Sequence, residues 1–390
     1  MRYLPRLIEP QVRAAVRHFP ALILTGPRRA GKTTLLRKLF PAASYVLLED
    51  PDTVARVRAD PRAFLEEIAP PAILDEIQNA PEILNYVRTL IDRSPTRKGR
   101  WLLTGSQEAG LMKGVTESMA GRAAVFQLLP LSRMETPKVT LLRGGFPEVV
   151  GRPSVAPVWF RSYVQTYLER DVRALSAIRD LVAFRRFLAL VASRNGQILN
   201  KTDLAAPLGV SVPTVSEWLR ILEVTGQIIL VPPFFENFGK RLVKSPKLYF
   251  VDSGLGCHLL GIETEAQLRR SPFLGPLFEG FVAAEVVKLQ LARGRAREIY
   301  YFRDQQGLEV DFLVPVGSGR LALLEAKASR TLRPEAGEPM ARLAKAARGH
   351  TVRSYLVHAG APGGAGIAAV RPGVRAVSVE ELPLVLAGKA

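Results

Sequence analysis

The chain of 390 residues is 47% hydrophobic and 23% charged, a composition that favours a globular protein with a sizeable core over wholesale disorder. Its 54 lysines and arginines against 36 acidic residues give a net charge of +18, which favours a polyanionic partner, nucleic acid or an anionic membrane face, although an arginine-rich proteome explains the surplus equally well. One cysteine, Cys257, excludes intrachain disulfides, and the lack of a signal-peptide core or of any run of about 18 apolar residues predicts a cytoplasmic protein without a membrane span.

Four segments follow one another along the chain. Residues 1–130 alternate short apolar runs with helical patterns, which predicts a parallel sheet flanked by helices. Residues 131–180 have the pattern of a helical lid or connector. Helices dominate again over 181–235, where we expect a winged helix-turn-helix whose wing extends to position 250. Strand-like runs return over 236–390 and predict a second α/β domain.

The stretch GPRRAGKTT has the spacing G-x-x-x-x-G-K-[ST] and lies between the apolar run ALILT and the helical pattern TTLLRKLF. Its glycines let successive backbone N–H groups surround a phosphate at the positive end of a helix dipole. Lys32 can then reach the β- and γ-phosphates, and the Thr33 hydroxyl can ligate Mg²⁺. ATP and Mg²⁺ are therefore the predicted cofactors. The predicted ATP-binding residues are Gly26, Pro27, Arg28, Arg29, Ala30, Gly31, Lys32, Thr33 and Thr34.

Polar residues end two further apolar runs of the first segment. PAILDEIQ supplies Asp75 for the Mg²⁺ shell, directly or through water, and Glu76 to orient the attacking water. The alternative is a surface Asp-Glu pair that caps a helix. In WLLTGSQ a further strand ends with Thr104 and Ser106, hydroxyls suited to sensing the γ-phosphate, although simple capping explains both residues equally well.

Taken in order, these motifs resemble those of bacterial and archaeal AAA+-type ATPases that carry a C-terminal region of unassigned function. The matching stretches are LTGPRRAGKTTLL, AILDEIQ, LLTGSQ, SMAGRAAVFQLLPLS, GGFPEVV and YLERDV, which cover most of the first 175 residues. The resemblance implies a ring-like homo-oligomer, with a hexamer expected, in which an arginine from one subunit completes the neighbour's site. Arg122 in SMAGR is the matching candidate and Arg170 in YLERD is the reserve; a surface salt bridge is the alternative role of each.

The third segment contains the helical stretches FRRFLALVASRNGQ, KTDLAAPLG and SVPTVSEWLRILEVTG. Ser211 is a plausible N-cap of the third, and Pro213 falls in its first turn. QIILVPPFFENFGKRLVKSPKLYFV would form the wing, where basic residues gather. A winged helix that packs between domains and contacts no DNA is the alternative. The predicted DNA-binding residues are Lys201, Ser211, Thr214, Lys240, Arg241, Lys244 and Lys247.

Carboxylates also follow apolar runs near the C-terminus. Asp311 is followed by the sequence Glu325-Ala-Lys327, and Glu285 lies on a preceding helical stretch, an order that resembles PD-(D/E)XK nucleases. The resemblance implies Glu285, Asp311 and Glu325 as ligands of Mg²⁺, with Lys327 steadying a water. A retired nuclease kept as a scaffold and ordinary surface charges are the alternatives. We favour Mg²⁺ or Mn²⁺ binding, since converging carboxylates repel one another without a cation.

The sequence therefore predicts an α/β protein with a P-loop AAA+ parallel-sheet ATPase core, a helical segment, a winged helix-turn-helix and a C-terminal nuclease-like domain. We expect an oligomeric ATPase that couples hydrolysis to remodelling or translocation on duplex or branched DNA, such as four-way junctions. The alternatives are an ATP-switched DNA-binding regulator or scaffold, and an ATP-gated nuclease. A membrane-surface role is disfavoured because no amphipathic anchor is present.

Overall fold

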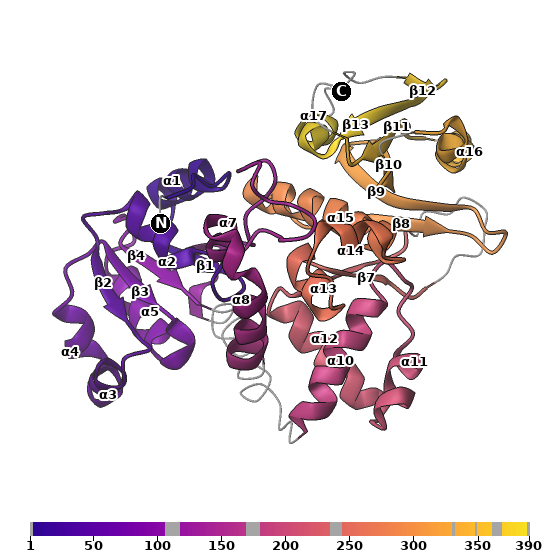
Figure 1. Cartoon of the computed structure of the whole chain (residues 1–390). Helices are drawn as coiled ribbons and strands as arrows, with labels where there is room; N and C mark the ends of the chain where they lie inside the picture. The colour runs from indigo at the N-terminus through magenta and orange to yellow at the C-terminus, as the bar shows by residue number, and fades with distance from the viewer. Residues whose placement is uncertain are drawn as a thin grey trace. The chain divides into compact units, whose positions relative to one another are not determined.

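The structure is a computed structural model in which residues 3–105, 118–168, 180–234, 244–329, 332–347, 349–360 and 369–387 are described (Figure 1). The chain divides into two compact units. The first unit comprises Met1–Leu131, Val224–Gly226 and Leu291–Arg295, and the second comprises Ser132–Glu223, Gln227–Gln290 and Ala296–Ala390. The first unit is therefore discontinuous in sequence, which the segment boundaries drawn from the sequence do not anticipate.

The first unit contains a five-stranded parallel sheet in the order β2-β3-β4-β1-β5. Its strands are β1 (Ala21–Thr25), β2 (Ser44–Leu47), β3 (Ala72–Asp75), β4 (Trp101–Thr104) and β5 (Ala123–Gln127). Every residue of β1, β3 and β4 is buried, as expected for parallel strands that are covered on both faces. The predicted α/β core with a parallel sheet is confirmed.

Alternate residues of β1 point to opposite faces of the sheet, where separate apolar clusters form. Ile23 packs in a cluster with Val87 of α5, and Leu22 packs in another with residues of α1 and α2. Helices thus cover both faces of the sheet. The helices and the 3₁₀ turn of this unit are α1 (Glu9–His18), α2 (Lys32–Leu39), α3 (Pro51–Ala59), α4 (Pro61–Glu66), η1 (Ile77–Asn79) and α5 (Ile83–Arg93).

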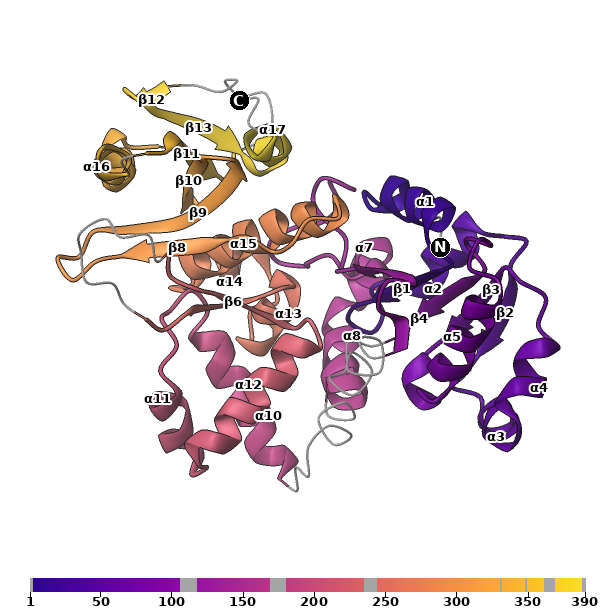
Figure 2. The same ribbon diagram turned by 180° about the vertical axis from the view of Figure 1, so that it is seen from behind.

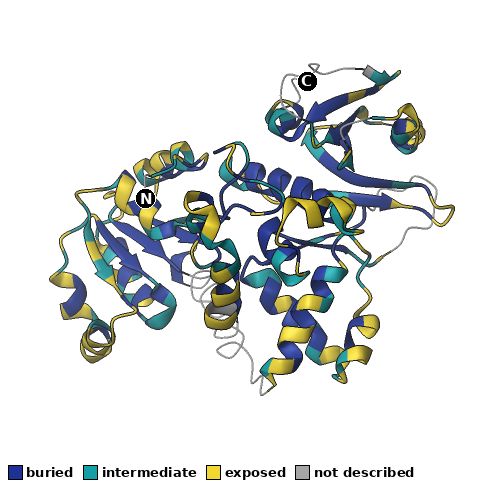
Figure 3. Cartoon of the chain, in the orientation of Figure 1, coloured by how far each residue is buried: buried dark blue, intermediate teal, exposed yellow. Residues whose placement is uncertain are grey.

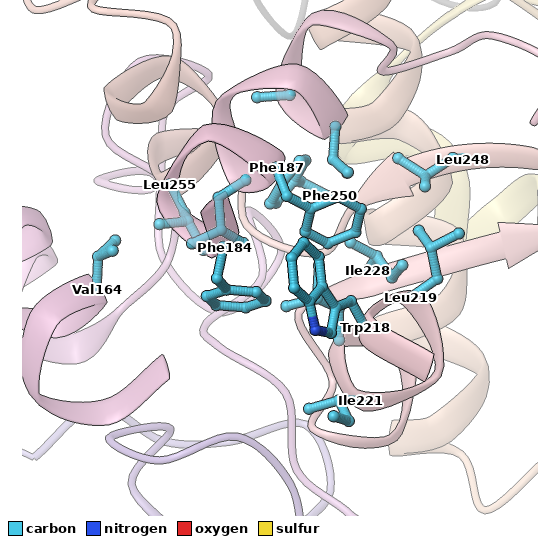
Figure 4. Close-up of a cluster of buried hydrophobic side chains, with 14 of the residues drawn as sticks. Val164, Phe184, Phe187, Trp218, Leu219, Ile221, Ile228, Leu248, Phe250 and Leu255 are labelled. Carbon is cyan, nitrogen blue, oxygen red and sulfur yellow. The ribbon is translucent and has the colours of Figure 1, made fainter. Parts of the chain in front are cut away.

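The helical part of the second unit surrounds an aromatic core (Figure 4). The Trp218 ring meets Phe184 and Phe187 at centroid distances of 5.4 and 5.0 Å and is 3% exposed, so it belongs to the core. Strands β6 and β7 follow as an antiparallel pair, with β6 visible in Figure 2. The elements are α7 (Pro147–Gly151), η2 (Pro153–Val155), α8 (Ala156–Tyr163), the π-helix η3 (Val164–Leu168), α10 (Leu181–Ser193), α11 (Lys201–Ala205), η4 (Ala206–Leu208), α12 (Val212–Val224), β6 (Ile228–Val231) and β7 (Lys247–Phe250).

The GGFP stretch of the second unit has a structural role. Asp252 accepts hydrogen bonds from the backbone N–H of Gly145 at 2.7 Å and of Leu255 at 3.0 Å. A Cβ added at Gly144, whose φ is 66°, would lie 2.0 Å from the Asp252 carboxylate. Only glycine therefore fits against this buried aspartate, which caps the N-terminus of the helix that follows it.

A six-stranded mixed sheet ends the second unit, in the order β12-β13-β11-β10-β9-β8. β8, β9 and β10 are antiparallel neighbours, and β11 runs parallel to both β10 and β13. Helix α15 is buried along most of its length (Figure 3). The elements are α13 (Ser253–Leu259), α14 (Glu265–Arg270), α15 (Leu274–Ala292), β8 (Tyr300–Arg303), β9 (Glu309–Gly317), β10 (Arg320–Lys327), η5 (Pro334–Gly337), α16 (Glu338–Ala346), β11 (Thr351–His358), β12 (Ala369–Arg371), β13 (Val374–Ser378), η6 (Val379–Glu381) and α17 (Leu382–Leu386).

Among the residues that the structure describes, no helix has the length and apolar character needed to cross a membrane.

Candidate functional site

The glycine-rich loop leaves the carboxyl end of β1 and turns into α2. Gly26 has a φ of 138°, and a Cβ there would lie 2.1 Å from the carbonyl oxygen of Leu128. Gly31 is the N-cap of α2, with a φ of 95° and no side-chain capping bond. Both positions require glycine. The resulting turn leads directly into the N-terminus of α2, where backbone N–H groups can serve an anion.

Lys32 points into the loop rather than to solvent. Its side-chain ammonium donates to the carbonyl oxygens of Gly26 and Pro27, each at 3.0 Å, and the residue is 4% exposed. The positive charge is therefore held inside the turn that a phosphate would enter. This is the position expected from the motif.

Asp75, at the end of β3, receives hydroxyl groups from three other segments. Thr33 Oγ1 lies 2.9 Å from both carboxylate oxygens, and the Tyr45 hydroxyl donates to Oδ2 at 2.8 Å. Thr104 Oγ1, at the end of β4, is hydrogen-bonded to Oδ1. Hydroxyl and carboxylate oxygens are hard ligands of the kind that Mg²⁺ prefers, so Thr33 and Asp75 fit the predicted cation.

Glu76 has an unusual backbone conformation for a non-glycine residue, with a φ of 60°. Its N–H donates to Thr104 Oγ1 at 3.3 Å, so Thr104 contacts both acidic residues. The carboxylate accepts a hydrogen bond from Gln78 and lies 3.7 Å from the guanidinium of Arg28. Arg28 is also 3.9 Å from Glu49. The glutamate predicted to orient water is therefore held by a residue of the phosphate-binding loop.

Sequence reasoning missed two residues of this site. Tyr45 reads as one more apolar residue of the run SYVLL, yet burial and the hydrogen bond to Asp75 raise its pKa above the ordinary value. Arg6 is 8% exposed and donates to the carbonyl oxygens of Ala30 at 2.9 Å and Leu129 at 2.7 Å, so it braces the loop from below. No local motif marks either residue.

Arg122 lies where the parallel strands begin, whereas the phosphate-binding loop lies where β1 ends. Its carbonyl oxygen accepts from the N–H of Ala21, where β1 begins, so the length of β1, roughly 15 Å, separates it from its own phosphate site. Its side chain forms a two-point salt bridge with Asp92, at 2.7 and 3.0 Å. The hydrogen bond from Arg122 lowers the pKa of Asp92. Ser106 and Arg170 lie outside the described residues.

Glu285 is not part of the C-terminal carboxylate group, and its prediction as a metal ligand is wrong. It is fully buried, and Oε2 accepts from the hydroxyl of Ser132 at 2.6 Å and the N–H of Arg133 at 2.8 Å. Lys288 donates to Oε1 at 3.0 Å. Glu285 is thus fully engaged in packing α15 against the segment that follows the ATPase core.

The α15 residue that does meet the strand carboxylates is Glu279. Six helical positions separate it from Glu285, a rotation of about 240° that places the two side chains on different faces of the helix. Strands β9 and β10 bring Asp311 and Glu325 to the same place. We call Glu279, Glu309, Asp311 and Glu325 the acidic cluster; two lysines are interleaved with it.

Lys247 and Lys327 supply the positive charges of the acidic cluster. Lys247 is 3.0 Å from Glu279 and 2.6 Å from Glu309, and Lys327 is 2.8 Å from Glu325. Burial and the nearby Asp311 carboxylate raise the pKa of Glu279 and of Glu325 to about 7. Over the described parts of the chain, no three histidine, cysteine or acidic side chains are arranged to hold a metal ion. The predicted set of Glu285, Asp311 and Glu325 is therefore not assembled.

The predicted DNA-binding residues have different environments. Lys201 and Lys244 are exposed, and Ser211 caps its helix by accepting from the N–H of Thr214 at 3.2 Å. Lys247 is 3% exposed and paired with carboxylates, so its prediction as a phosphate contact is wrong. Lys240 and Arg241 lie outside the described residues.

Comparison with known families matches three regions of the chain. Residues 18–136 match an AAA domain. Residues 134–266 and 274–363 match two domains of unknown function, DUF8612 and DUF4143. The AAA match includes the phosphate-binding loop together with Asp75, Glu76 and Arg122.

Among solved structures, the Walker-type ATPase paby2304 of Pyrococcus abyssi is similar at 14% identity and a TM-score of 0.43, covering 65% of this chain and 94% of that one. AMPPCP-bound DnaA from Aquifex aeolicus is similar at 12% identity and a TM-score of 0.29, covering 56% of this chain and 86% of that one. Neither likeness is strong enough to bear on function.

Two curated relatives extend over most of the chain. The uncharacterized proteins Rv2008c of Mycobacterium tuberculosis and Mb2031c of Mycobacterium bovis are each 34% identical over 328 residues, which is 82% of this chain and 73% of each relative. With its phosphate-binding loop and acidic strand end inside an AAA domain, the chain belongs to the family of these mycobacterial proteins.

Proposed function

We propose that the first unit binds ATP with Mg²⁺ and hydrolyses it, and that the protein couples this hydrolysis to remodelling of, or movement along, DNA. One observation carries the ATPase proposal. Lys32, Thr33 and Asp75 meet at one edge of the parallel sheet, with Thr33 2.9 Å from the Asp75 carboxylate. Such a meeting of cation, hydroxyl and carboxylate suits a nucleotide triphosphate with its metal ion.

The residues have separate tasks in this mechanism. Lys32 exchanges the carbonyl oxygens of Gly26 and Pro27 for phosphate oxygens. Thr33 and Asp75 would hold Mg²⁺, which neutralises charge on the β- and γ-phosphates. Glu76 orients the attacking water, which requires its carboxylate to leave Arg28. Thr104 fixes Asp75 and Glu76 relative to each other, because it is hydrogen-bonded to both.

Arg122 acts across a subunit boundary in this proposal. It cannot reach the phosphate site of its own chain, because β1 lies between them. Its partner Asp92 is on the surface, so the salt bridge can be exchanged for a neighbour's phosphate at little cost. A ring-like homo-oligomer, with a hexamer expected from the family resemblance, would place Arg122 in that position.

DNA binding is assigned to the helical part of the second unit. The net charge of +18 favours a polyanion, and Lys201 and Lys244 are exposed at α11 and before β7. The end of helix α12 also lies beside the loop that is proposed to bind the nucleotide. The residues at and just after its end, Val224–Gly226, belong to the first unit, and a Cβ at Gly226 would lie 3.1 Å from Pro27 of the phosphate-binding loop.

The test is the rate of ATP hydrolysis without DNA and with single-stranded, duplex and four-way DNA. A motor on DNA predicts that one of these forms raises the rate well above the others. The second candidate is an ATP-switched DNA-binding scaffold, which the position of Gly226 beside the loop also suits. Equal, slow hydrolysis with all forms of DNA, together with ATP-dependent DNA binding, would favour this candidate. The Lys32→Ala variant is the control for contaminating ATPases, and no hydrolysis above that control would contradict the proposal.

A further inference from the structure

The acidic cluster contains a cation that belongs to the chain itself. Lys247 comes from β7, which pairs with β6, whereas Asp311 and Glu325 belong to the six-stranded sheet. Its ammonium lies 3.0 Å from Glu279, 2.6 Å from Glu309 and 3.9 Å from Asp311. A single lysine thus reaches carboxylates on helix α15 and on strand β9.

Lys247 is built into this position rather than resting on a surface. Its side chain is 4% exposed, and burying an ammonium is unfavourable unless carboxylates surround it. Burial lowers its pKa, but the carboxylates of Glu279, Asp311 and Glu309 outweigh burial and keep the lysine charged. Tyr249, two positions along β7 and therefore on the same face, also donates to Glu279.

Donors of the chain itself occupy one oxygen of each of three carboxylates in the cluster. Glu279 Oε1 accepts from both Lys247 and Tyr249, Asp311 Oδ2 accepts from the N–H of Ala326 at 2.9 Å, and Glu325 Oε1 accepts from Lys327. Glu325 Oε2 is buried without a hydrogen-bond partner among the described residues.

The balance of charge leads to the same conclusion. The four carboxylates of the cluster face Lys247, Lys327 and Arg303, whose guanidinium lies 3.5 Å from Glu309. Three cations of the chain therefore lie among four carboxylates.

We propose that the acidic cluster is a binding site for an ammonium group, that Lys247 fills it in place of a divalent metal ion, and that this contact fastens β7 to the C-terminal sheet. We call this contact the lysine latch. It makes the C-terminal region a structural mount for the hairpin of β6 and β7 rather than a metal-dependent nuclease. The inference does not depend on the ATPase assignment.

The test uses the full chain and compares Lys247→Met with Lys244→Met, a matched change at an exposed lysine three positions earlier. We expect wild type to bind no Mn²⁺ at the cluster, as measured by electron paramagnetic resonance with Asp311→Asn as the control for location. Lys247→Met should lower the thermal midpoint by on the order of 10 °C, because it leaves buried and partly buried carboxylates without their cation. Lys244→Met should not.

A second variant keeps the test decisive if Lys247→Met alone does not fold. Adding Glu279→Gln removes one of the uncompensated charges, so the double variant should recover part of the lost thermal midpoint. Gain of Asp311-dependent Mn²⁺ binding by either Lys247 variant would also support the latch. Mn²⁺ binding by wild type that disappears in Asp311→Asn would overturn the proposal. Equal thermal midpoints for Lys247→Met and Lys244→Met would overturn it as well. So would a double variant whose loss of thermal midpoint is the sum of the losses caused by Lys247→Met and Glu279→Gln separately.

Discussion

The hydroxyl of Thr33 lies 2.9 Å from both carboxylate oxygens of Asp75, although the two residues are 42 positions apart in the chain. Thr33 lies in the first turn of the helix after β1, whereas Asp75 ends β3, with β4 between these strands in the sheet. The contact therefore depends on the whole parallel sheet. It also fixes the place where the predicted nucleotide chemistry must occur.

Substitution of Lys32 should impair ATP binding, whereas substitution of Glu76 should impair hydrolysis alone. Lys32 serves the phosphates in the ground state, so Lys32→Ala should weaken ATP binding and reduce hydrolysis by at least roughly a hundredfold. Glu76→Gln should abolish hydrolysis but keep ATP bound, because the glutamate acts mainly on water. Nucleotide titration and phosphate release measure the two effects. Lys38→Ala, an exposed lysine of the same helix, is the control, and tight ATP binding by Lys32→Ala would contradict the assignment.

Arg122→Ala should inactivate the enzyme, and mixing should rescue it. Assemblies of Arg122→Ala and Glu76→Gln subunits contain some interfaces with both groups intact, so part of the activity should return. Asp92→Asn, which releases Arg122 without removing it, should remain active. If mixed assemblies form, as shown by differently tagged subunits, and still do not hydrolyse ATP, Arg122 has no role across the boundary.

Gly226→Ala should uncouple DNA stimulation from basal hydrolysis. An alanine there has an unfavourable φ of 71° and its Cβ presses on Pro27 at 3.1 Å, which displaces the chain after α12 from the loop. Gly261→Ala is the matched control, since Gly261 has the same φ of 71° and nothing within 4 Å of an added Cβ. We expect the ratio of DNA-stimulated to basal rate to fall only in Gly226→Ala. The same ratio in both variants would mean that the contact carries no signal.

Charge reversal at Lys240, Arg241 and Lys244 should weaken duplex DNA binding and flatten its salt dependence. Each phosphate contact that is lost should reduce the slope of log K against log salt by about 0.9. Fluorescence anisotropy at several salt concentrations measures the slope, and Lys38→Glu in the first unit provides the control. A slope equal to that of wild type would place the DNA contacts on another surface.

The second unit should be more stable at pH 5 than at pH 8. Burial and Asp311 raise the pKa of Glu279 and Glu325 to about 7 in the folded chain, from an ordinary value of 4.5. Between these values the native state binds more protons than the unfolded state, so the free energy of unfolding falls as the pH rises and levels off above pH 7.

Urea unfolding of wild type and Glu325→Gln across this range tests the pH dependence. Glutamine cannot ionise, so the variant should show a smaller fall between pH 5 and pH 8. Glu338→Gln, an exposed position on α16, should behave like wild type. A wild-type stability that is flat or rises with pH would contradict the raised pKa values.

Local pattern and tertiary packing account for what the sequence could and could not predict. The positions of Lys32 and Asp75 follow from strand, turn and helix signals that are contiguous in the chain. Glu279 and Glu285 lie on the same helix, and α15 is buried on so many sides that its apolar pattern does not tell which glutamate faces which neighbour. Only the packing of α15 separates them.

Charge counting failed for Lys247 for a related reason. The residue lies in a basic stretch typical of a nucleic-acid contact, but the carboxylates that bind it are 32 positions or more further along the chain. Tyr45 likewise looks apolar until β2 and β3 are paired, because its hydroxyl finds Asp75 only across the sheet. Pairing between distant segments has no local signal, and these residues depend on it.

The discontinuous first unit has a practical consequence for anyone who wishes to study it in isolation. Ala292 packs against the apolar cluster that contains Ile8 and Leu22, and Gly226 packs against Pro27. A truncated protein that stops at Leu131 lacks both of these segments, so apolar side chains of the first unit become exposed to water. We expect such a fragment to be insoluble on expression, whereas the full chain supplies its own missing pieces from residues that lie far beyond the truncation point.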